Sequence, residues 1–275
     1  MKSPPIALWI WYRGDVFWGF QGQGTLHTVQ GALRQALLRI GVISAPVGAG
    51  RTDKGVHARM QVVRIREASL SPVDLVARLT SHLPSGLGVC AARAASRSFH
   101  PQWSSAGKEY RYRLCLGQSC PGWELFSWNP QEHPRLLDRT VRPEKLSELL
   151  TLAAGTRDFI AFHEKSSPQR PRTLRDAKLV ECSPGRLEIR LDGDAFGRYQ
   201  ARYLVGSAIA AAAGAVPVEQ YLAGLEQGVA FPGLRAPAHG LILWEITYPP
   251  QLDPFADQER RGAPNLPAEP PFQSW

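Results

Sequence analysis

The sequence predicts an α+β protein in which one sheet runs through two related lobes. Strand-like apolar runs alternate with segments of helical periodicity in both halves of the 275-residue chain. Residues 174–192 read as a hairpin, because Ser183-Pro184-Gly185 separates two strand-like runs. Apolar content of 44% and charged content of 20% are ordinary for a folded protein with a sizeable core. The length suits two modest domains or one large one.

The first lobe opens with a buried strand, Ile6–Tyr12, followed by a loop that mixes aromatic and amide side chains. Apolar residues at helical spacing predict a helix from Val29 to Ile40. Thr28 is the expected N-cap of this helix, and Gly41 is the residue expected to end it. These signals place the first helix directly after the aromatic loop.

Further along the first lobe, an extended run is expected from Met60 to Arg66. Ser71-Pro72 then opens a second helix with a hydroxyl cap and a first-turn proline, and a short strand follows near Val89. Lys108–Leu116 is the clearest strand, with Tyr and Leu facing one way and Arg facing the other. Its basic face suits either a nucleic-acid surface or an ordinary solvated strand face.

The second lobe repeats this scheme. We expect helices that begin at Pro143, Phe196 and Pro217, a basic loop over residues 165–175, and a final strand Leu241–Tyr248. The predicted organisation is a lobe at 1–116, a connector at 117–142, a lobe at 143–249 and a tail at 250–275. The tail is rich in proline and is expected to be disordered or draped over the surface.

The charge of the chain points to a polyanionic partner. The net charge is +8, and because the last 25 residues hold four acids and two bases, the preceding 250 residues carry +10. Each phosphate that such a surface neutralises releases condensed counterions. A merely basic, soluble protein is the alternative on charge alone.

The cysteines and the apolar runs indicate the compartment. Cys90, Cys115, Cys120 and Cys182 show neither a Cys-x-x-Cys pair nor a His/Cys ligand spacing, so reduced thiols and no metal site are expected. No apolar run has membrane-spanning length, and the N-terminus lacks a signal-peptide pattern. The sequence therefore predicts a soluble, cytoplasmic protein without a membrane partner.

The stretch with the strongest chemical signal is Gly48–Ala58, in which Asp53 lies among three glycines with Arg51, Lys54 and His57 close by. Glycines let a ligand approach the main chain, and a neighbouring cation keeps a carboxylate ionised. An ionised Asp can act as nucleophile, base or electrostatic stabiliser. An Asx-turn is the structural alternative for an isolated Thr-Asp-x-Gly.

The string Gly-x-Gly-Arg-Thr-Asp-x-Gly-Val-His-Ala resembles the catalytic loop of the TruA family of tRNA pseudouridine synthases. Further segments resemble the same family, so that the likeness runs from about Ile6 to Tyr248: Phe17–Gln23, Ser98–His100, Lys108–Tyr112, Gly155–Phe159, Phe196–Gly206 and Ala236–Leu241. Lys54, Gly197, Gln200 and Ala201 differ from the residues usual in the family.

The resemblance implies the pseudouridine synthase fold, in which two lobes share a mixed, largely antiparallel sheet flanked by helices around a central basic cleft. It implies an isomerase that converts uridine to pseudouridine in the anticodon stem-loop of tRNA, at positions 38 to 40 of tRNA numbering. It implies no cofactor, and it implies a homodimer.

The catalytic residues implied are Asp53 as nucleophile or base, Arg202 as its partner, and Tyr110, which stacks on the base. The implied substrate-binding residues are Arg51, Thr52, Gly55, His57, Phe20, Gln21, Arg111 and Arg172. His57 is expected to shape the loop by hydrogen bonding rather than to move a proton.

Other function classes fit less well. A catalytically silent RNA-binding or RNA-folding protein of the same fold would share the charge and the aromatic loops, but it would not need Asp53 paired with Arg202. A zinc-dependent deaminase would need a His/Cys cluster with a nearby Glu, and the sequence shows none. A nucleotide-binding enzyme would need a Gly-rich phosphate loop with Lys-Ser/Thr, which is also absent.

Overall fold

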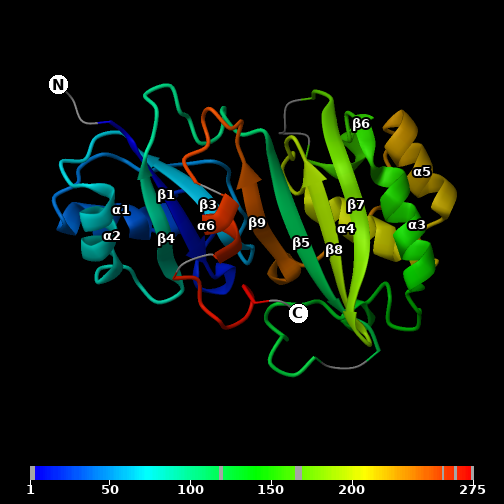
Figure 1. The fold of residues 1–275 in the computed structure, drawn as a ribbon. Coiled ribbons are helices and arrows are strands. Elements are labelled where there is room, and N and C mark those ends of the chain that lie inside the picture. Colours follow the sequence, from blue (N-terminus) through cyan, green and yellow to red (C-terminus); the bar gives the residue numbers. More distant parts are fainter. Residues whose placement is uncertain (1–3, 118–119, 165–168, 256, 263–264, 274–275) are drawn as a thin grey trace. The chain divides into compact units, whose positions relative to one another are not determined.

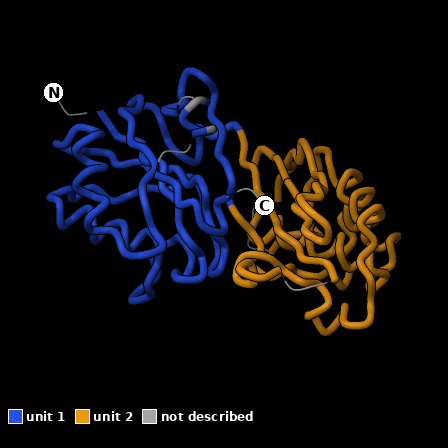
Figure 2. Tube along the Cα trace, turned by 60° about the horizontal axis from the view of Figure 1, so that its bottom comes forward, with its two compact units in different colours: residues 1–106, 243–273 blue, residues 107–242, 274–275 orange. Residues whose placement is uncertain are grey.

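A computed structural model describes residues 4–117, 120–164, 169–255, 257–262 and 265–273. Part of the predicted basic loop, residues 165–168, lies outside the described residues. The chain forms two compact units (Figure 2). Unit 1 consists of Met1–Ala106 and Leu243–Gln273, and unit 2 is built mainly from Gly107–Ile242. The lobe and tail boundaries predicted from composition stay predictions.

Unit 1 contains a sheet in the strand order β4-β1-β3-β9 (Figure 1), and β2 pairs with β3. Strand β1 is antiparallel to both β3 and β4. The strands are β1 Ile6–Tyr12, β2 Val47–Gly48, β3 His57–Ile65, β4 Leu87–Ala94 and β9 Leu241–Thr247, of which the last begins in unit 2. Nearly every side chain of β1 and β3 is buried, and β3 buries the polar residues His57, Arg59 and Gln61 among its apolar ones.

Two helices of unit 1 begin at the caps that the sequence predicts. Helix α1 spans Val29–Arg39, and the hydroxyl of Thr28 accepts a hydrogen bond from the amide of Gly31. Helix α2 spans Pro72–Thr80, and the hydroxyl of Ser71 accepts from the amide of Asp74. Both helices turn a buried apolar stripe inward, so the predicted caps and stripes are confirmed.

The segment after β9 packs on unit 1. The sequence left two alternatives for it, disorder or packing on the surface, and its described residues pack. Phe255 meets the ring of Trp9 edge-on at 6.1 Å, and Phe272 meets Trp11 at 5.5 Å. This segment includes helix α6, Asp257–Gly262.

Arg260 of α6 is the polar anchor of that segment. Its guanidinium is buried and donates to both carboxylate oxygens of Asp253 at 2.7 and 2.6 Å. It also donates to Glu245 at 3.1 Å and to the carbonyl of Ile246 at 2.7 Å, both on β9. The C-terminal segment is therefore fastened to the sheet by aromatic contacts and by a charge-assisted network.

Unit 2 carries an antiparallel sheet in the order β5-β8-β7-β6. Helix α3 packs on β7 and on α4, which in turn packs against α5. The strands are β5 Gly107–Cys115, β6 Gly155–Arg157, β7 Arg172–Ser183 and β8 Arg186–Gly193, and the helices are α3 Pro143–Ala153, α4 Gln200–Ala212 and α5 Val218–Gln227. Short 3-10 turns lie at Gly14–Val16, Pro130–Glu132, Ile160–Phe162 and Ala238–Gly240.

The start of α4 corrects one expectation. The helix begins at Gln200 rather than Phe196, because Tyr199 adopts the left-handed conformation with φ of 63°. A helix cannot continue through that conformation. The predicted hairpin of β7 and β8 is confirmed, and Gly185 in its turn has φ of +74°.

The cysteines correct another expectation. Cys115 and Cys120 form a disulfide, so the prediction that all four thiols are reduced is wrong for this pair. Cys90 and Cys182 are free thiols. The two Cα atoms of the pair lie 6.1 Å apart, within bridging range, and a five-residue spacing alone does not reveal this. Cys115, Cys120, Trp123 and Phe126 form one buried apolar cluster.

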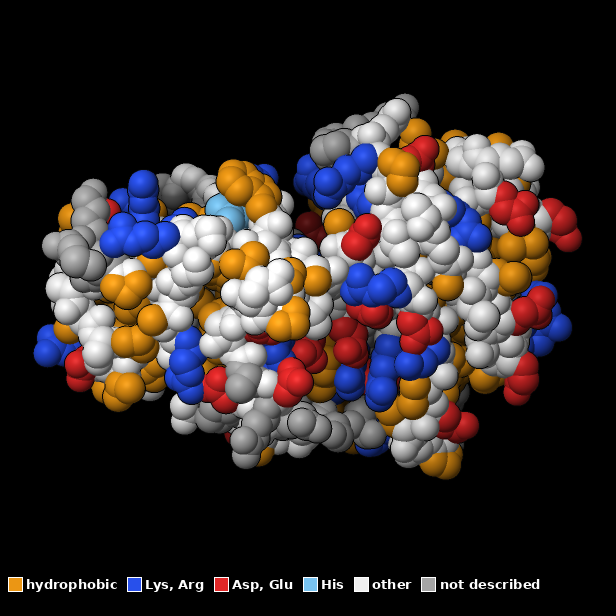
Figure 3. Space-filling model, turned by 45° about the horizontal axis from the view of Figure 1, so that its top comes forward, with side chains coloured by type: hydrophobic (Ala, Val, Ile, Leu, Met, Phe, Trp, Pro, Cys, Tyr) orange, Lys and Arg blue, Asp and Glu red, His pale blue; other side chains and the backbone are white. Residues whose placement is uncertain are grey.

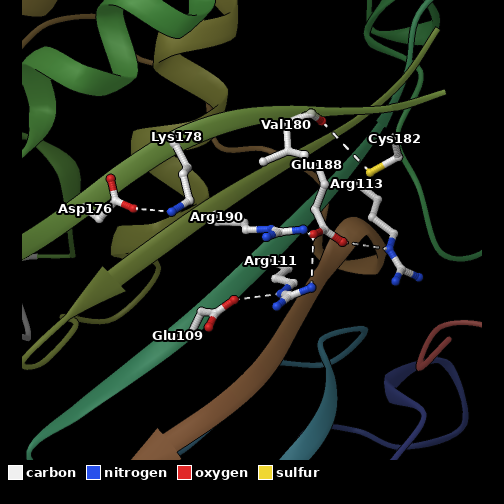
Figure 4. A network of polar contacts seen from close by, with 9 residues as sticks. All are labelled: Glu109, Arg111, Arg113, Asp176, Lys178, Val180, Cys182, Glu188 and Arg190. Atoms are coloured by element: carbon white, nitrogen blue, oxygen red, sulfur yellow. Dashed lines mark hydrogen bonds and ion pairs between the residues drawn. The ribbon is translucent and has the colours of Figure 1, made fainter. Parts of the chain in front are cut away.

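The basic face of β5 is an internal ion-pair cluster rather than a solvated face (Figure 4). Glu188 of β8 lies at its centre with a side chain that is 3% exposed. It contacts Arg190 at 2.8 Å, Arg111 at 3.2 Å and Arg113 at 3.5 Å, and Arg113 is completely buried. Burial lowers the pKa of Arg113 to about 10, and the neighbouring carboxylate opposes this shift.

Within the described ranges, no helix is long and apolar enough to cross a bilayer. Nor do His, Cys, Asp and Glu gather there in groups of three or more that could hold a metal ion.

Candidate active site

Asp53 lies in unit 1, in the loop that joins β2 to β3. Close contacts explain two glycines of this region. A Cβ on Gly48 would lie 2.3 Å from the ring of Phe20, and a Cβ on Gly14 would lie 2.3 Å from the carbonyl oxygen of Val56. Gly55 has φ of +88°. At Gly48 and Gly14 a side chain would therefore block this close packing, and at Gly55 it would strain the backbone.

A buried hydrogen-bond network fixes the conformation of the Asp53 loop. The hydroxyls of Tyr12 and Thr52 lie 2.8 Å apart, and Gln61 donates to the carbonyl of Gly50 at 2.8 Å. Gln61 also accepts from the amide of Ala49 at 3.2 Å. Tyr12 and Gln61 are fully buried, so these bonds form in a low dielectric and fix the backbone on both sides of Arg51.

Burial raises the pKa of Tyr12 far above its usual value, and the charge of Asp53 adds to the rise. The phenol therefore stays protonated and keeps a proton to donate.

His57 is completely buried at the start of β3, and its Nδ1 accepts a hydrogen bond from the amide of Gly14 at 3.0 Å. The nearest oxygen of Asp15 lies 4.0 Å from the same nitrogen. His57 thus ties the aromatic loop to the strand that follows Asp53, as a loop-shaping hydrogen bonder would.

The remaining predicted residues of unit 1 differ in how they relate to this loop. Phe20 is buried, and its amide donates to the carbonyl of Thr52 at 3.1 Å. Gln21 donates to the side chain of Gln30 at 2.9 Å. Arg51 is exposed. Phe20 and Thr52 therefore support the loop from inside, while Arg51 is open to solvent beside Asp53.

Tyr110 and Arg202 lie in unit 2, so each is described within that unit. Tyr110 is largely buried on β5 and meets the ring of Phe196 edge-on at 4.9 Å. Arg202 is in the first turn of α4, and its Nε donates to the carbonyl of Ala236 at 2.8 Å. The amide of Ala236 returns a bond to the carbonyl of Arg202 at 3.0 Å. The Nε edge of the Arg202 guanidinium is thereby held by the loop before β9.

Two further residues steady that loop. The hydroxyl of fully buried Tyr112 donates to the carbonyl of Pro237 at 2.9 Å. A Cβ on Gly240 would lie 2.7 Å from the Tyr112 ring.

Burial lowers the pKa of His239, and the charge of Arg202 contributes to this lowering. His239 is therefore neutral at pH 7.

The other two predicted RNA contacts of unit 2 have partners inside the unit. Arg111 pairs with Glu109 at 2.7 Å as well as with Glu188. Arg172 is buried, and it donates to the carbonyls of Asp158 and Arg170 at 3.5 and 3.3 Å. Burial lowers the pKa of Arg172. Their predicted contact with RNA stays a prediction.

The sequence reasoning missed Tyr12 and Gln61 as supports of the loop. The only sequence signal for Tyr12 was its polar hydroxyl at the end of an apolar strand, and an ordinary core tyrosine gives the same signal. The sequence reasoning also gave no weight to Tyr199, Arg198 and Arg235 beside Arg202.

Basic and acidic side chains are interspersed on the face shown in Figure 3, where the positive charge occurs in several groups.

Comparison with known proteins gives a consistent result. A family model described as tRNA pseudouridine synthase matches residues 151–249. The chain is 35% identical over 250 residues to tRNA pseudouridine synthase A of Thermus thermophilus, covering 86% of this chain and 94% of the relative. It is 34% identical over 259 residues to the same-named protein of Chlorobaculum tepidum, covering 88% and 97%.

It is also 31% identical over 258 residues to tRNA pseudouridine synthase A of Thermodesulfovibrio yellowstonii, covering 88% of this chain and 99% of the relative. Among solved structures, a Cbf5-Nop10-Gar1 complex gives a weak match with a TM-score of 0.36 and 13% identity. That match covers 80% of this chain, which spans only 56% of the solved chain.

Proposed function

Because the chain belongs to the TruA family of tRNA pseudouridine synthases, we propose that it isomerises uridine to pseudouridine in tRNA with Asp53 as the catalytic carboxylate. The observation that supports this most directly is the loop itself. Its backbone is held by the Tyr12–Thr52 and Gln61–Gly50 hydrogen bonds, and Asp53 lies beside them. A carboxylate on so constrained a loop is preorganised, as a catalytic group requires.

The reaction breaks the C1′–N1 bond of uridine and forms a C1′–C5 bond. The C5 proton leaves and N1 gains a proton, so the atoms balance without an oxidant, a reductant or a transferred group. Asp53 acts as nucleophile at the sugar or as base, and the freed ring turns before it is rejoined. The target base must leave its stack, which costs a few kcal/mol, and phosphate contacts offset this cost.

Two residues of unit 2 complete the proposed catalytic group. Arg202 would pair with Asp53 and hold it ionised, since a guanidinium matches a carboxylate with two parallel bonds. The bond from its Nε to Ala236 sets the orientation of its planar group within unit 2. Tyr110 would stack on the base and serve in the deprotonation at C5.

The finer assignments follow the family. We propose uridines 38 to 40 of the anticodon stem-loop as targets, action without a cofactor, a homodimer as the working form and the cytoplasm as its location. Mapping pseudouridine in tRNA from cells with and without this gene tests the positions. A sedimentation profile of an active monomer at micromolar concentration would rule out the dimer.

Asp53→Asn is the decisive variant, because it keeps the shape of the side chain and removes its charge. Turnover should vanish while tRNA affinity stays within a few-fold. Asp74→Asn, at the exposed start of α2, is the matched control and should be fully active. Residual activity of Asp53→Asn above a tenth of the wild-type value would exclude Asp53 as the catalytic group.

Arg202→Lys tests the pairing. A point-like ammonium cannot reproduce the planar contact, so most turnover should be lost with folding and RNA affinity intact. A wild-type protein that binds tRNA tightly but forms no pseudouridine would instead favour the silent RNA-binding alternative.

A further inference from the structure

Trp18 and Lys54 form a contact beside Asp53 that the proposed chemistry does not use. The ammonium nitrogen of Lys54 lies over the Trp18 ring, 3.3 Å from the ring centroid. Trp18 is 50% exposed, and Lys54 is exposed as well. A cation–π pair therefore lies at the surface of unit 1, next in sequence to the proposed catalytic carboxylate.

The loop that carries Trp18 packs directly on the Asp53 loop. Gly19, the next residue, has φ of +84°, and a Cβ on it would lie 2.8 Å from the carbonyl oxygen of Thr52. The same Cβ would lie 3.2 Å from the amide nitrogen of Lys54, so a side chain at this position would push the two loops apart. The amide of Trp18 donates to the carbonyl of His27 at 2.8 Å. The backbone that carries the ring is therefore fixed on both sides.

The backbone that carries Lys54 is fixed by a turn. The amide of Val56 donates to the carbonyl of Asp53 at 3.1 Å, which closes a four-residue turn with Lys54 in its second position. The amide of Gly55 donates to the carbonyl of Gly14 at 3.1 Å. Adjacent Cα atoms lie about 3.8 Å apart, so the turn presents a carboxylate and an ammonium from neighbouring positions.

The ring orients the ammonium of Lys54 but gives its N–H groups no acceptor oxygen. An ammonium has three donors, and the face of an indole attracts its charge electrostatically. Among the described residues, no carboxylate lies within ion-pair distance of the Lys54 nitrogen. The donors of Lys54 are therefore held in place by the ring and remain available to an anion that binds beside it.

The proposed reaction brings such an anion to this position. Asp53 acts at the sugar of the target uridine, and in RNA that sugar is linked to a phosphate on each side. Since Lys54 follows Asp53 within one turn, a sugar bound at Asp53 places one of these phosphates near the ammonium. Arg51 is exposed two residues before Asp53, so positive charge flanks the carboxylate on both sides along the chain. A phosphate is the anion that this arrangement favours.

We propose that Lys54, oriented by the ring of Trp18, binds a backbone phosphate next to the target uridine. A point-like ammonium suits this contact, because it can turn its three donors to whichever phosphate oxygen approaches. The ring reduces the conformational freedom that the long side chain would otherwise lose on binding. The proposal rests on the proposed function, from which it takes the target nucleotide and the role of Asp53.

The test removes the charge of the phosphate and the charge of Lys54 in turn. It uses the full chain and tRNAs that carry one neutral methylphosphonate beside a uridine of positions 38 to 40. One of these tRNAs should bind the wild-type protein about fivefold more weakly than unmodified tRNA, which is the upper range for an exposed ion pair. Lys54→Met should bind the two tRNAs alike, because the cation that meets this phosphate is gone. If no methylphosphonate weakens wild-type binding more than Lys54→Met binding, the proposal is wrong.

The role of the ring is tested in the same assay. Trp18→Leu should reduce the effect of the methylphosphonate, since the ammonium is then no longer oriented. Trp18→Phe should preserve the effect, because phenylalanine keeps an aromatic face for the cation. An undiminished effect in Trp18→Leu would overturn the part of the proposal that concerns Trp18.

Two other roles of Lys54 predict different results. If its contact with Trp18 only stabilises the loop, Lys54→Met weakens the binding of both tRNAs equally. If Lys54 acts only on the charge of Asp53, the variant shifts the pH profile of kcat and leaves the effect of the methylphosphonate unchanged. Either result would overturn the proposal.

Lys145→Met is the matched control, because it also removes one lysine charge. Lys145 lies on α3 and pairs with Glu148 at 2.9 Å. This variant should show the full wild-type effect of the methylphosphonate, and loss of the effect here would also count against the proposal. Failure of the proposed function is read separately, from pseudouridine formation by the wild-type protein on unmodified tRNA, because the binding measurement does not depend on turnover.

Discussion

Glu188 should be the most sensitive acidic position in unit 2. Its carboxylate contacts three arginines while its own side chain is 3% exposed, and Arg113 beside it is completely buried. Glu188→Gln keeps the shape and removes the charge. The guanidinium of Arg113 would then lose its carboxylate partner in a low-dielectric site, where its burial already lowers its pKa.

The expected loss follows from burial. Breaking a buried pair by removing one partner costs about 3–5 kcal/mol. Arg190, with a side chain 32% exposed, adds less than about 1 kcal/mol, and Arg111 keeps its second carboxylate, Glu109. We therefore expect Glu188→Gln to lower the free energy of unfolding by about 3–5 kcal/mol. With a urea m-value of about 2 kcal/mol/M, the midpoint falls by roughly 2 M.

Urea unfolding followed by circular dichroism measures this loss. Asp176→Asn is the matched control, because its pair with Lys178 on the same sheet has side chains 49% and 54% exposed (Figure 4). It should shift the midpoint very little. Adding Arg113→Met to Glu188→Gln should recover part of the loss, since the buried cation is then gone. A Glu188→Gln midpoint equal to that of the control would refute this account of the cluster.

Three further predictions concern single side chains. Tyr12→Phe removes the bond to Thr52 and should cost about 1–2 kcal/mol of unfolding free energy, with kcat falling more than KM rises in a tRNA assay. The pKa of His239 is lowered by burial from 6.5, so below that pH the unfolded chain binds a proton that the folded chain does not. Stability should therefore fall as pH drops below about 6.5, and less steeply in His239→Gln; parallel urea midpoints at pH 7.5 and 5 would argue against this. Arg260→Met should cost about 3 kcal/mol and expose residues 249–273 to proteolysis, whereas Arg93→Met, which removes the half-exposed pair with Glu259, should have a much smaller effect.

The sequence predicted what depends on local pattern. The α+β class, the caps at Thr28 and Ser71, and the hairpin after β7 are confirmed, because each depends on residues adjacent in the chain. The family was also identified correctly, since its motif around Asp53 is a contiguous string.

What the sequence did not predict depends on distant partners. Arg113 reads as a solvated strand residue until Glu188, 75 residues away, is placed beside it. Tyr12 reads as core until Thr52 and Gln61 meet its hydroxyl. The disulfide of Cys115 depends on how closely Cys120 approaches it. Patterns of period two or three to four carry no information about such contacts.

The division of the chain into two units determines which unit is fully synthesised first during translation. Unit 2 is essentially one continuous stretch, Gly107–Ile242, so all of its strands and helices are present before the last part of the chain is made. Unit 1 is split, and it lacks β9 beside β3 and the segment anchored by Arg260 until the final residues arrive. Domains form as units during translation. The N-terminal strands, with buried Trp9 and the Asp53 loop, therefore lack β9 and the segment of Arg260 until residues 241–260 are made, and over that interval the edge of β3 is open to aggregation.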